Sequence, residues 1–377
     1  MPTAVDWVGQ TDRDFENALT LPGRVYWDPA VFAREEQQIF GKDWLCVGHV
    51  SRLASPGDFF LVNLGRESVI LAADKQGTPH AFYNVCRHRG TRVVNDASGS
   101  CRLFRCPYHD WAYGLDGRLM SAPNMEETPN FRREDFPLRE VRLELWNGFL
   151  FINLDPDALP MSAVYDDFPD LSYLNLHRLQ RVGYHHYDVD ANWKLICENY
   201  NECYHCALAH PQLHRISVDR EYPDLNHVGK HFTGGPMAIR QGFNTMTTSG
   251  VTDRAPLPGW KDSDKDMVMY FNLYPNLLLS IAPDYLLTHY IWPTGPETVY
   301  IETEWFCATE QIEQPGFDPR DAIEFWDTTN RQDWGLCENA LRGLRSTGHR
   351  PGPYQSWETC VHDFDRWYVR RVFACQD

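Results

Sequence analysis

The sequence has few basic residues and no long hydrophobic run. It contains 35 lysines and arginines against 52 aspartates and glutamates, a formal net charge of −17, which argues against binding to nucleic acids or anionic membranes. No segment approaches the roughly 18 apolar residues of a transmembrane helix, because the longest candidate is broken by Pro283 and Asp284. The first residues are acidic and lack the apolar core of a signal peptide. We therefore expect a cytoplasmic protein.

Other features missing from the sequence exclude further classes of protein. There is no internal repeat and no low-complexity segment, which argues against a solenoid or a disordered protein. The chain also has no G-x-G-x-x-G after a strand and no plant-type C-x4-C-x2-C run, the motifs of a dinucleotide site and a ferredoxin cluster. Without a secretion signal, its 11 cysteines predict reduced thiols and metal ligands rather than a disulfide framework.

The chain is long enough for two domains, and the pattern of helix-like and strand-like segments along it predicts where they lie. An N-terminal arm contains a helix that starts near Asp28 and Pro29. Short strands such as "DFFLVNLG", "ESVILAAD" and "FLFINLD" follow. The remainder mixes helices with β-rich sequence, so the fold class is α+β. The predicted parts are an arm, a β domain and a larger catalytic domain, at residues 1–45, 46–155 and 156–377. Within the last, we expect helices at about 192–210 and 318–345, and strands at about 267–308.

The β domain carries a pair of cysteine–histidine loops. Cys86 and His88 form C-x-H, and Cys106 and His109 form C-x-x-H after a gap of seventeen residues. Zinc modules usually supply paired cysteines and paired histidines instead. One thiolate and one imidazole per loop suit a Rieske [2Fe–2S] cluster, in which one iron takes both cysteines and the other both histidines. Cys101 breaks this spacing, and we expect no role for it.

The chain resembles the α subunits of Rieske non-haem iron oxygenases nearly end to end. The resemblance is carried by "FYNVCRHRGTRV", "CPYHDWAYGLDGRL", "ANWKLICENYNECYHCALAHP" and "FWDTTNRQDWGLCE". It implies an antiparallel β Rieske domain and a helix-grip catalytic domain with an antiparallel sheet and long helices. It also implies a [2Fe–2S] cluster, one mononuclear Fe(II) per subunit and a head-to-tail homotrimer, in which one subunit's cluster reaches the next subunit's iron.

His205 and His210 are the candidate histidine ligands of the mononuclear iron, which needs two His and one carboxylate with positions left open for O2. Their spacing of five is awkward for a helix, but Pro211 should push His210 out of the helical region. Alternatively, His210 is only a helix-terminal charge and His205 a core residue. A structural zinc site could use Cys203 and Cys206; we expect these instead to be small buried thiols.

Asp333 is the candidate carboxylate ligand. Trp326, Asp333 and Ala340 recur every seven residues and place the carboxylate on an apolar helix face, where it needs a cation or strong hydrogen bonds. The family's aspartate ligand, followed five residues later by a glutamate, here Glu338, aligns with it. Asp327 is the competing carboxylate.

Glu202 precedes His205 by three residues, which would place both on one helical face. The family usually has an aspartate here, bridging an iron-bound histidine to a Rieske histidine of the neighbouring subunit. A glutamate in this motif is similar to members that oxidise betaines and carnitine. Such outer carboxylates orient the imidazole that they contact. An ordinary salt-bridged glutamate is the alternative.

The expected function is that of a terminal oxygenase, which hydroxylates a small quaternary ammonium compound with C–N cleavage. The alternatives are an aromatic-acid ring hydroxylase and, from another class, a non-catalytic Rieske electron carrier or redox sensor. Since the dinucleotide motif is missing, a separate flavin and [2Fe–2S] NAD(P)H reductase must supply electrons. Five arginines around the cluster loops could steer it: Arg87, Arg89, Arg92, Arg102 and Arg105. Aromatic residues could form a cation–π cage: Tyr270, Phe271, Tyr274, Tyr285, Tyr290, Trp292 and Trp305.

Overall fold

The computed structural model describes residues 8–218 and 227–373. The chain forms two compact units, a small unit at Gly41–Ala158 and a large unit made of Met1–Phe40 with Leu159–Asp377. The sequence prediction placed these boundaries at residues 45 and 155. The small unit extends beyond both because Asn153 Nδ2 donates to the Lys42 carbonyl at 2.9 Å and the Arg142 guanidinium donates to the Ala158 carbonyl.

The small unit is built from short antiparallel sheets, ordered β1-β10-β9, β4-β3-β2-β5 and β6-β7-β8. Its strands are β1 (Leu45–His49), β2 (Asp58–Leu64), β3 (Glu67–Ala73), β4 (Pro79–Tyr83), β5 (Ser98–Ser100), β6 (Phe104–Arg105), β7 (Ala112–Tyr113), β8 (Leu119–Ser121), β9 (Arg142–Trp146) and β10 (Phe149–Asn153). Phe59, Ile70 and Phe82 belong to its core, and so do Cys86 and Cys106. The cysteines of the paired loops are therefore anchored in packed structure.

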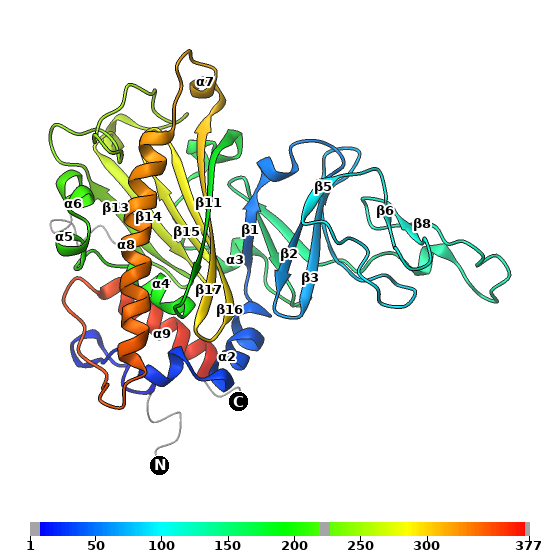
Figure 1. The fold of residues 1–377 in the computed structure, drawn as a ribbon, viewed down its shortest axis with the longest axis horizontal. Helices are drawn as coiled ribbons and strands as arrows, with labels where there is room; N and C mark the ends of the chain where they lie inside the picture. The colour runs from blue at the N-terminus through cyan, green and yellow to red at the C-terminus, as the bar shows by residue number, and fades with distance from the viewer. Residues whose placement is uncertain (1–7, 219–226, 374–377) are drawn as a thin grey trace. The chain divides into compact units, whose positions relative to one another are not determined.

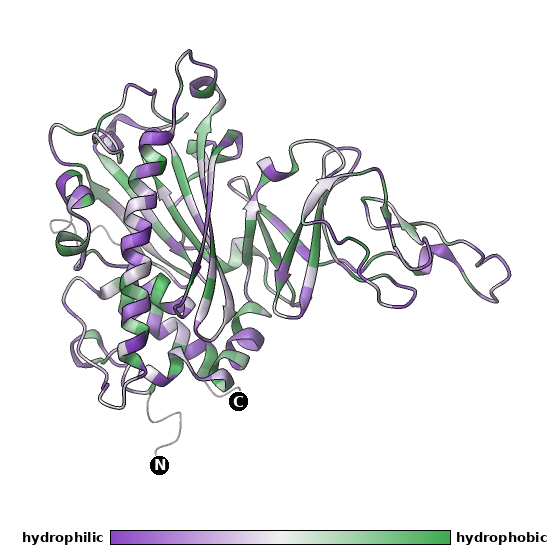
Figure 2. Ribbon diagram, viewed as in Figure 1, coloured by the Kyte–Doolittle hydropathy of each residue, from purple (hydrophilic) through white to green (hydrophobic). Residues whose placement is uncertain are grey.

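The described part of the large unit contains one antiparallel sheet, ordered β11-β17-β16-β15-β14-β13-β12. Its strands are β11 (Leu179–Val189), β12 (His227–Val228), β13 (Phe232–Ala238), β14 (Met267–Leu273), β15 (Leu277–Ile281), β16 (Leu286–Gly295) and β17 (Thr298–Ala308). In Figure 2 the central strands are mostly hydrophobic, as strands covered by other elements should be. The α+β class and the antiparallel sheets are confirmed.

Helices cover this sheet, and α8 lies across one face of it (Figure 1). The helices are α2 (Pro29–Glu35), which continues as the π-helical η3 (Glu36–Phe40), α3 (Met161–Val164), α4 (Trp193–Tyr200), α5 (Cys206–Ala209), α6 (Pro211–Ile216), α7 (Thr309–Ile312), α8 (Arg320–Leu344) and α9 (Thr359–Phe373). The short 3-10 turns are η1 (Phe15–Asn17), η2 (Gly23–Tyr26), η4 (Val50–Leu53), η5 (Arg133–Asp135), η6 (Ser172–Leu174), η7 (Leu176–Arg178) and η9 (Asp262–Asp264). Within 8–218 and 227–373, no helix is long and apolar enough to cross a bilayer.

The long helix α8 was predicted, but not the whole of its buried face. Ala340, which we expected on that face with Trp326 and Asp333, is exposed. The buried stripe follows helical spacing instead: Ala322, Phe325, Trp326, Thr329, Asn330, Trp334, Cys337 and Leu341. Asp333 lies between members of this stripe, and its side chain is only 14% exposed.

The N-terminal arm docks on the large unit through a buried ion pair. Lys194 Nζ donates to Glu35 Oε1 at 2.6 Å, and both side chains are fully buried. Tyr368 OH and Trp193 Nε1 also donate to the Glu35 carboxylate, at 2.6 and 2.8 Å. These hydrogen bonds satisfy charges that would otherwise be costly to bury, and they join α2, α4 and α9. We had not anticipated α9.

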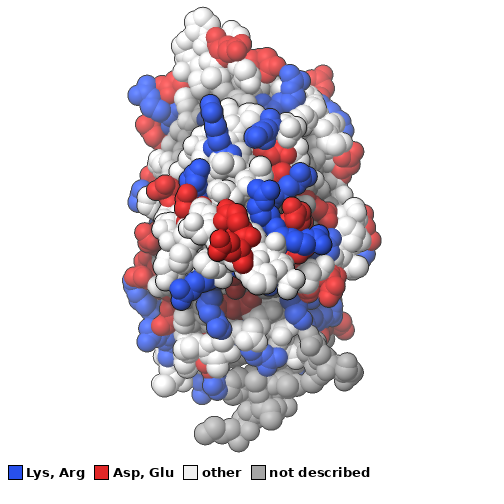
Figure 3. Space-filling model, turned by 90° about the vertical axis from the view of Figure 1, so that its right-hand side faces the viewer, with Lys and Arg blue, Asp and Glu red and all other residues white. Residues whose placement is uncertain are grey.

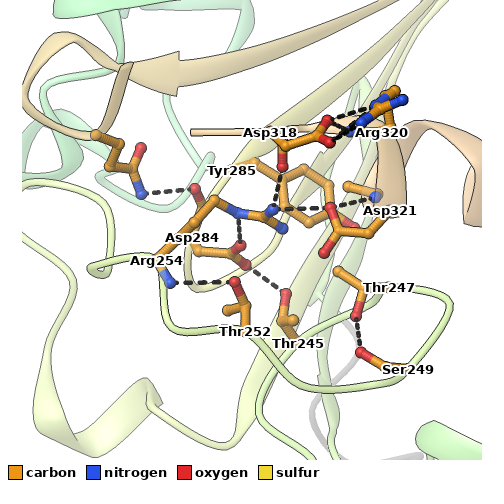
Figure 4. Close-up of polar contacts among 12 residues, drawn as sticks. Thr245, Thr247, Ser249, Thr252, Arg254, Asp284, Tyr285, Asp318, Arg320 and Asp321 are labelled. Carbon is orange, nitrogen blue, oxygen red and sulfur yellow. Dashed lines mark hydrogen bonds and ion pairs between the residues drawn. The ribbon is translucent and has the colours of Figure 1, made fainter. Parts of the chain in front are cut away.

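A second buried ionic cluster fixes the connection between β13 and β14. Arg254 donates to Asp284 and Asp321, both at 2.7 Å, and lies between them in Figure 4. Asp284 also accepts from the Thr245 hydroxyl. The neighbouring Tyr285 OH donates to the Met246 carbonyl at 2.5 Å. The connection is therefore held on the end of the sheet by charge-assisted hydrogen bonds.

Candidate metal centres

The two cysteine–histidine loops of the small unit have matching backbone geometry. In the first loop, Gly90 N donates to the Cys86 carbonyl at 3.0 Å, and Cys86 N donates to the Thr91 carbonyl at 2.8 Å. In the second, Asp110 N and the Cys106 carbonyl are 3.1 Å apart, and Cys106 N donates to the Trp111 carbonyl at 2.8 Å. The closing residues Gly90 and Asp110 both have positive φ, 75° and 59°. Two equivalent tight turns thus present one cysteine and one histidine each.

The four side chains differ in exposure as a two-iron cluster requires. Cys86 and Cys106 are 3% and 2% exposed, whereas His88 is exposed and His109 half-buried. The two imidazole ring centroids lie 4.5 Å apart, and Trp111 stacks on His88 at 4.9 Å. Buried thiolates and outward imidazoles suit a Rieske cluster whose histidine-bound iron lies near the surface.

The segment around His205 and His210 is not the continuous helix that we predicted over 192–210. Helix α4 ends at Tyr200, and α5 begins only at Cys206. The expected effect of Pro211 is confirmed, because His210 adopts φ −126° and ψ 70°, outside the helical region. This break turns His210 back toward His205, and their ring centroids are 5.1 Å apart.

Both imidazoles converge on Asp333 of α8. The His210 Nε2–Asp333 Oδ1 distance is 2.8 Å, and the His205 Nε2–Asp333 Oδ1 distance is 3.2 Å. The competing Asp327 instead pairs with Arg331 at 2.9 Å and accepts from Tyr187 OH at 2.8 Å. Two imidazole nitrogens and one carboxylate oxygen around one point are the donor set of mononuclear Fe(II).

Hydrogen bonds to the Nδ1 atoms orient these two imidazoles. Gln332 Oε1 lies 2.7 Å from His210 Nδ1, and Glu202 Oε1 lies 2.5 Å from His205 Nδ1. An accepting oxygen at Nδ1 leaves Nε2 free to bind a metal, the usual arrangement around metal-bound histidines. No sequence pattern pointed to Gln332, since only the folded chain brings it beside a histidine 122 residues away.

The pKa values of His205 and Asp333 reflect the close contact between imidazoles and carboxylates at this point. Burial lowers the pKa of His205, but hydrogen bonds with Asp333 and Glu202 outweigh this effect and raise it to about 10. Burial raises the pKa of Asp333, but hydrogen bonds from His205 and His210 outweigh it and lower the pKa. The carboxylate therefore stays charged in a largely buried position and requires positive charge beside it. These residues fit the iron that the motif implies.

Cys203 and Cys206 form a disulfide, so the prediction of two separate buried thiols was wrong. Their Cα atoms are 4.9 Å apart, within disulfide range, because the chain turns sharply between α4 and α5. The Cys206 sulfur lies within 4.8 Å of the His205 and His210 ligand atoms. With both sulfurs bonded to each other, the zinc hypothesis lacks a free thiolate here.

Glu202 lies in the turn after α4 rather than on a shared helical face. Its carboxylate accepts from the backbone N–H groups of Tyr204 and His205 as well as from the imidazole. The side chain is 13% exposed, so part of it reaches the protein surface. Glu202 therefore contacts His205, as predicted, but a turn rather than a helix brings the two residues together.

A cavity adjoins His205, His210 and Asp333 and is rich in aromatic side chains. Its aromatic lining consists of Tyr200, Tyr270, His289, Trp326, Trp334 and Trp357. Among the described lining residues, Glu202 and Asp333 supply the carboxylates, and there is no lysine or arginine. Of the aromatic residues proposed from sequence, only Tyr270 borders it. Phe271, Tyr290, Trp292 and Trp305 lie elsewhere in the strands, and Tyr274 and Tyr285 lie in the connections between strands. The cavity therefore offers aromatic faces and negative charge.

Comparison with known proteins agrees with this geometry. Residues 43–132 match the Rieske [2Fe-2S] domain, and residues 176–374 match the catalytic domain of the ring hydroxylating alpha subunit. The chain is 32% identical to the glycine betaine monooxygenase oxygenase subunit of Chromohalobacter salexigens (95% of this chain, 87% of that protein). It is 31% identical to the carnitine monooxygenase oxygenase subunit of Escherichia coli K12 (89% and 87%).

A solved structure of a quaternary ammonium Rieske monooxygenase, described in terms of carnitine oxidation and inter-subunit electron transfer, superposes with a TM-score of 0.79 at 26% identity, covering 99% of this chain and 98% of that one. The fold, both domain matches and the relatives over most of the chain agree. The chain therefore belongs to the Rieske non-haem iron oxygenases, as an oxidoreductase α subunit with a [2Fe–2S] cluster and a mononuclear iron.

Proposed function

We propose that the protein is the terminal oxygenase of a multicomponent system and hydroxylates a betaine-like quaternary ammonium compound. Hydroxylation at an N-methyl group or the adjacent carbon would lead to cleavage of the C–N bond. The observation that carries this proposal is the cavity beside Asp333, which is lined by aromatic rings and carboxylates without a lysine or arginine among its described residues. Aromatic faces attract cations, most strongly where water is excluded.

The same cavity disfavours the alternative substrate, an aromatic acid. An aromatic acid is a net anion, which beside Glu202 and Asp333 would need an arginine or lysine, and the described lining provides neither. A betaine carries no net charge, because its own ammonium group balances its carboxylate. Tyr270 OH and Trp334 Nε1 are buried without a hydrogen-bond partner in the described structure. These two neutral groups could donate hydrogen bonds to an oxygen atom of a zwitterionic substrate. The cationic end of that substrate would then lie against the aromatic rings. A pure electron carrier would leave the catalytic domain at residues 176–374 unexplained.

His205, His210 and Asp333 would hold the mononuclear iron. Bound there, iron would supply O2 activation, as in other two-His, one-carboxylate sites. Gln332 and Glu202 hold the Nδ1 protons of the two histidines, so that each Nε2 faces the metal position. The aromatic lining orients the substrate and excludes water from the reacting carbon.

Cys86, His88, Cys106 and His109 would hold the [2Fe–2S] cluster, which accepts electrons from a separate flavin and [2Fe–2S] NAD(P)H reductase. Arg87, Arg89 and Arg105 contact groups of their own unit: the Pro137 carbonyl, Tyr108 OH and Asp110. Basic and acidic side chains are interspersed on the face of the molecule shown in Figure 3. A docking surface here would therefore recognise the reductase by the pattern of charges on it rather than by its net charge.

We also propose a homotrimer in which the cluster of one subunit serves the iron of the next. Tyr204 and Leu208, beside His205, are 57% and 91% exposed, and Val85 and Tyr108, beside the cluster loops, are 41% and 53% exposed. Apolar groups exposed at both centres suit a heterologous contact between copies. Glu202, in contact with His205, would then link the two centres. We place the protein in the cytoplasm, since its described cysteines outside the Cys203–Cys206 pair are free.

Mass-spectrometric product analysis with a surrogate reductase tests this function. We expect trimethylammonium substrates such as glycine betaine and carnitine to be hydroxylated, and benzoate-type acids to remain unchanged. Three iron atoms per chain should accompany activity, two in the cluster and one in the mononuclear site. Oxidation of an aromatic acid but of no quaternary ammonium compound would refute the substrate proposal, and two iron atoms per chain would indicate a carrier.

A further inference from the structure

One cavity-lining residue has a buried nitrogen that the proposed iron site does not use. His289 lies on β16, is 2% exposed and borders the cavity. Its Nδ1 is buried and has no hydrogen-bond partner in the described structure. A buried polar atom without a partner is costly in the free enzyme. A substrate group could satisfy it.

The other ring nitrogen is tied to a hydrogen-bonded series that leads away from the cavity. His289 Nε2 lies 3.1 Å from Asn330 Oδ1, Asn330 Nδ2 donates to Tyr187 OH at 3.4 Å, and Tyr187 OH donates to Asp327 Oδ1 at 2.8 Å. Asp327 also faces His185 Nδ1 at 3.2 Å and Arg331 Nε at 2.9 Å. The series therefore starts at a charged carboxylate.

That carboxylate sets the direction of every hydrogen bond in the series. A carboxylate can only accept, so Tyr187 uses its single O–H on Asp327 and must accept from the Asn330 amide nitrogen. The Asn330 oxygen then faces His289 and accepts from Nε2–H. Burial lowers the pKa of His289 to about 4, so the ring is neutral at pH 7. With its one proton on Nε2, Nδ1 carries a lone pair.

We propose that His289 is a specificity-determining residue, whose Nδ1 accepts a hydrogen bond from a hydroxyl group of the bound substrate. This inference rests on the proposed quaternary ammonium substrate. A fully alkylated nitrogen has no N–H, and a carboxylate has no proton to donate, so a hydroxyl group is the donor that such a molecule can offer. The protein should therefore prefer hydroxylated quaternary ammonium compounds to their deoxy counterparts.

Isothermal titration calorimetry on the purified oxygenase tests the preference with two matched pairs. Choline and ethyltrimethylammonium differ by one hydroxyl group, and so do L-carnitine and γ-butyrobetaine. For at least one pair, we expect the wild type to bind the hydroxylated member about tenfold more tightly. His289→Phe keeps a ring of similar size and removes the acceptor, so the ratio of dissociation constants should fall close to one.

Tyr187→Phe tests the series from a position outside the cavity lining. It frees Asn330 to turn its amide and weakens the choice of tautomer, so the preference should shrink while both ligands still bind. Tyr184→Phe is the matched control, because Tyr184 lies on the same strand, is 40% exposed and bonds Tyr300 OH at 3.1 Å instead. This control should keep the wild-type ratio.

The outcomes separate this inference from the proposed function. Equal binding of both members by the wild type, or a preference that survives His289→Phe, overturns the role of His289 while leaving a quaternary ammonium oxygenase. A preference unchanged in Tyr187→Phe overturns the fixed tautomer. If no member of either pair binds the wild type, the proposed substrate class fails, and the inference fails with it.

Discussion

At the scale of single residues, Gln332 provides the sharpest test of the iron site, because it contacts a proposed ligand without being one. Gln332→Leu removes the acceptor 2.7 Å from His210 Nδ1 and should lower iron affinity about 10–100-fold. Iron content after dialysis against a graded chelator measures the change. Gln332→Glu restores an accepting oxygen and should bind iron more tightly than the leucine variant. Equal iron retention in both variants would mean that the residue does not orient His210.

Glu202→Gln separates a ligand role from a linking role. The amide keeps the size of the side chain and loses its charge, so iron should stay while electron transfer from the neighbouring cluster slows. Single-turnover oxidation of pre-reduced clusters measures this transfer. His205→Ala, His210→Ala and Asp333→Ala should instead lose mononuclear iron and keep the brown cluster. Loss of iron in Glu202→Gln would make Glu202 a ligand, and unchanged transfer would remove its linking role.

Much of the site could be foreseen because its signals are local. The five-residue spacing of His205 and His210, with Pro211 behind them, already indicates a broken helix, and φ −126° at His210 confirms the break. Gln332 and His289 could not be foreseen, since their roles depend on contacts across the fold. The Cys203–Cys206 disulfide was missed for a similar reason: its formation depends on the turn after α4.

At the scale of elements, the cluster around Arg254 predicts a large difference between two kinds of ion pair. The side chains of Arg254 and Asp284 are 12% and 1% exposed, so Arg254→Met leaves a buried carboxylate uncompensated and should cost about 3–5 kcal/mol of unfolding free energy. Arg320 and Asp318 are 77% and 44% exposed, so Arg320→Met should change the unfolding free energy far less, because solvent screens an exposed ion pair. Urea denaturation compares the two, and similar losses would contradict a special role for the buried cluster.

Strong patterns decided which elements were predictable. The 25-residue α8 (Arg320–Leu344) could be predicted from its apolar stripe, although Ala340 was wrongly placed on that stripe. The strands from β14 to β17 could be predicted from their β-rich composition. The ends of the helices were harder to predict. Helix α4, for example, ends where Asn201 N donates to the Cys197 and Glu198 carbonyls at 3.1 Å, a contact that no sequence pattern indicated. Helix α9 carries buried charges such as Asp365, which obscure its amphipathic pattern.

At the scale of the whole molecule, buried acids couple its stability to pH. Burial raises the pKa of Asp365 to about 7, and burial and the charge of Asp365 raise that of Glu198. Because the folded state holds the Asp365 proton more tightly than an unfolded chain with a pKa near 4, stability should fall as pH rises from about 4 through 7. Asp365→Asn removes this titration, and its amide can donate to Glu198.

The variant should therefore gain stability relative to the wild type by roughly 2–4 kcal/mol between pH 5 and pH 8. Chemical denaturation at the two pH values measures the change. Glu16→Gln, at an exposed position of the arm, is the control and should show no such gain. A constant difference between Asp365→Asn and the wild type at both pH values would contradict the proposed titration.

Reduction by the partner protein should depend on salt if arginines around the cluster steer docking. Screening acts over about 8 Å at physiological ionic strength, so the reduction rate should fall as salt rises. Arg102→Glu should slow reduction more than Arg105→Glu, because Arg105 already pairs with Asp110 at 2.9 Å. Stopped-flow reduction monitors both, with cluster content as the control. Rates independent of salt and of both changes would exclude steering by this surface.

The docking of the N-terminal arm constrains the order in which the chain folds during synthesis. Glu35 meets Tyr368 across 333 residues, so the arm must wait for nearly the whole chain to leave the ribosome. The small unit at Gly41–Ala158 pairs its first strand, β1, with its last, β10, so its described sheets are complete once β10 has been made. It can therefore fold while the catalytic domain is still being translated. Helix α2 is made early in synthesis and yet is among the last elements to find its place.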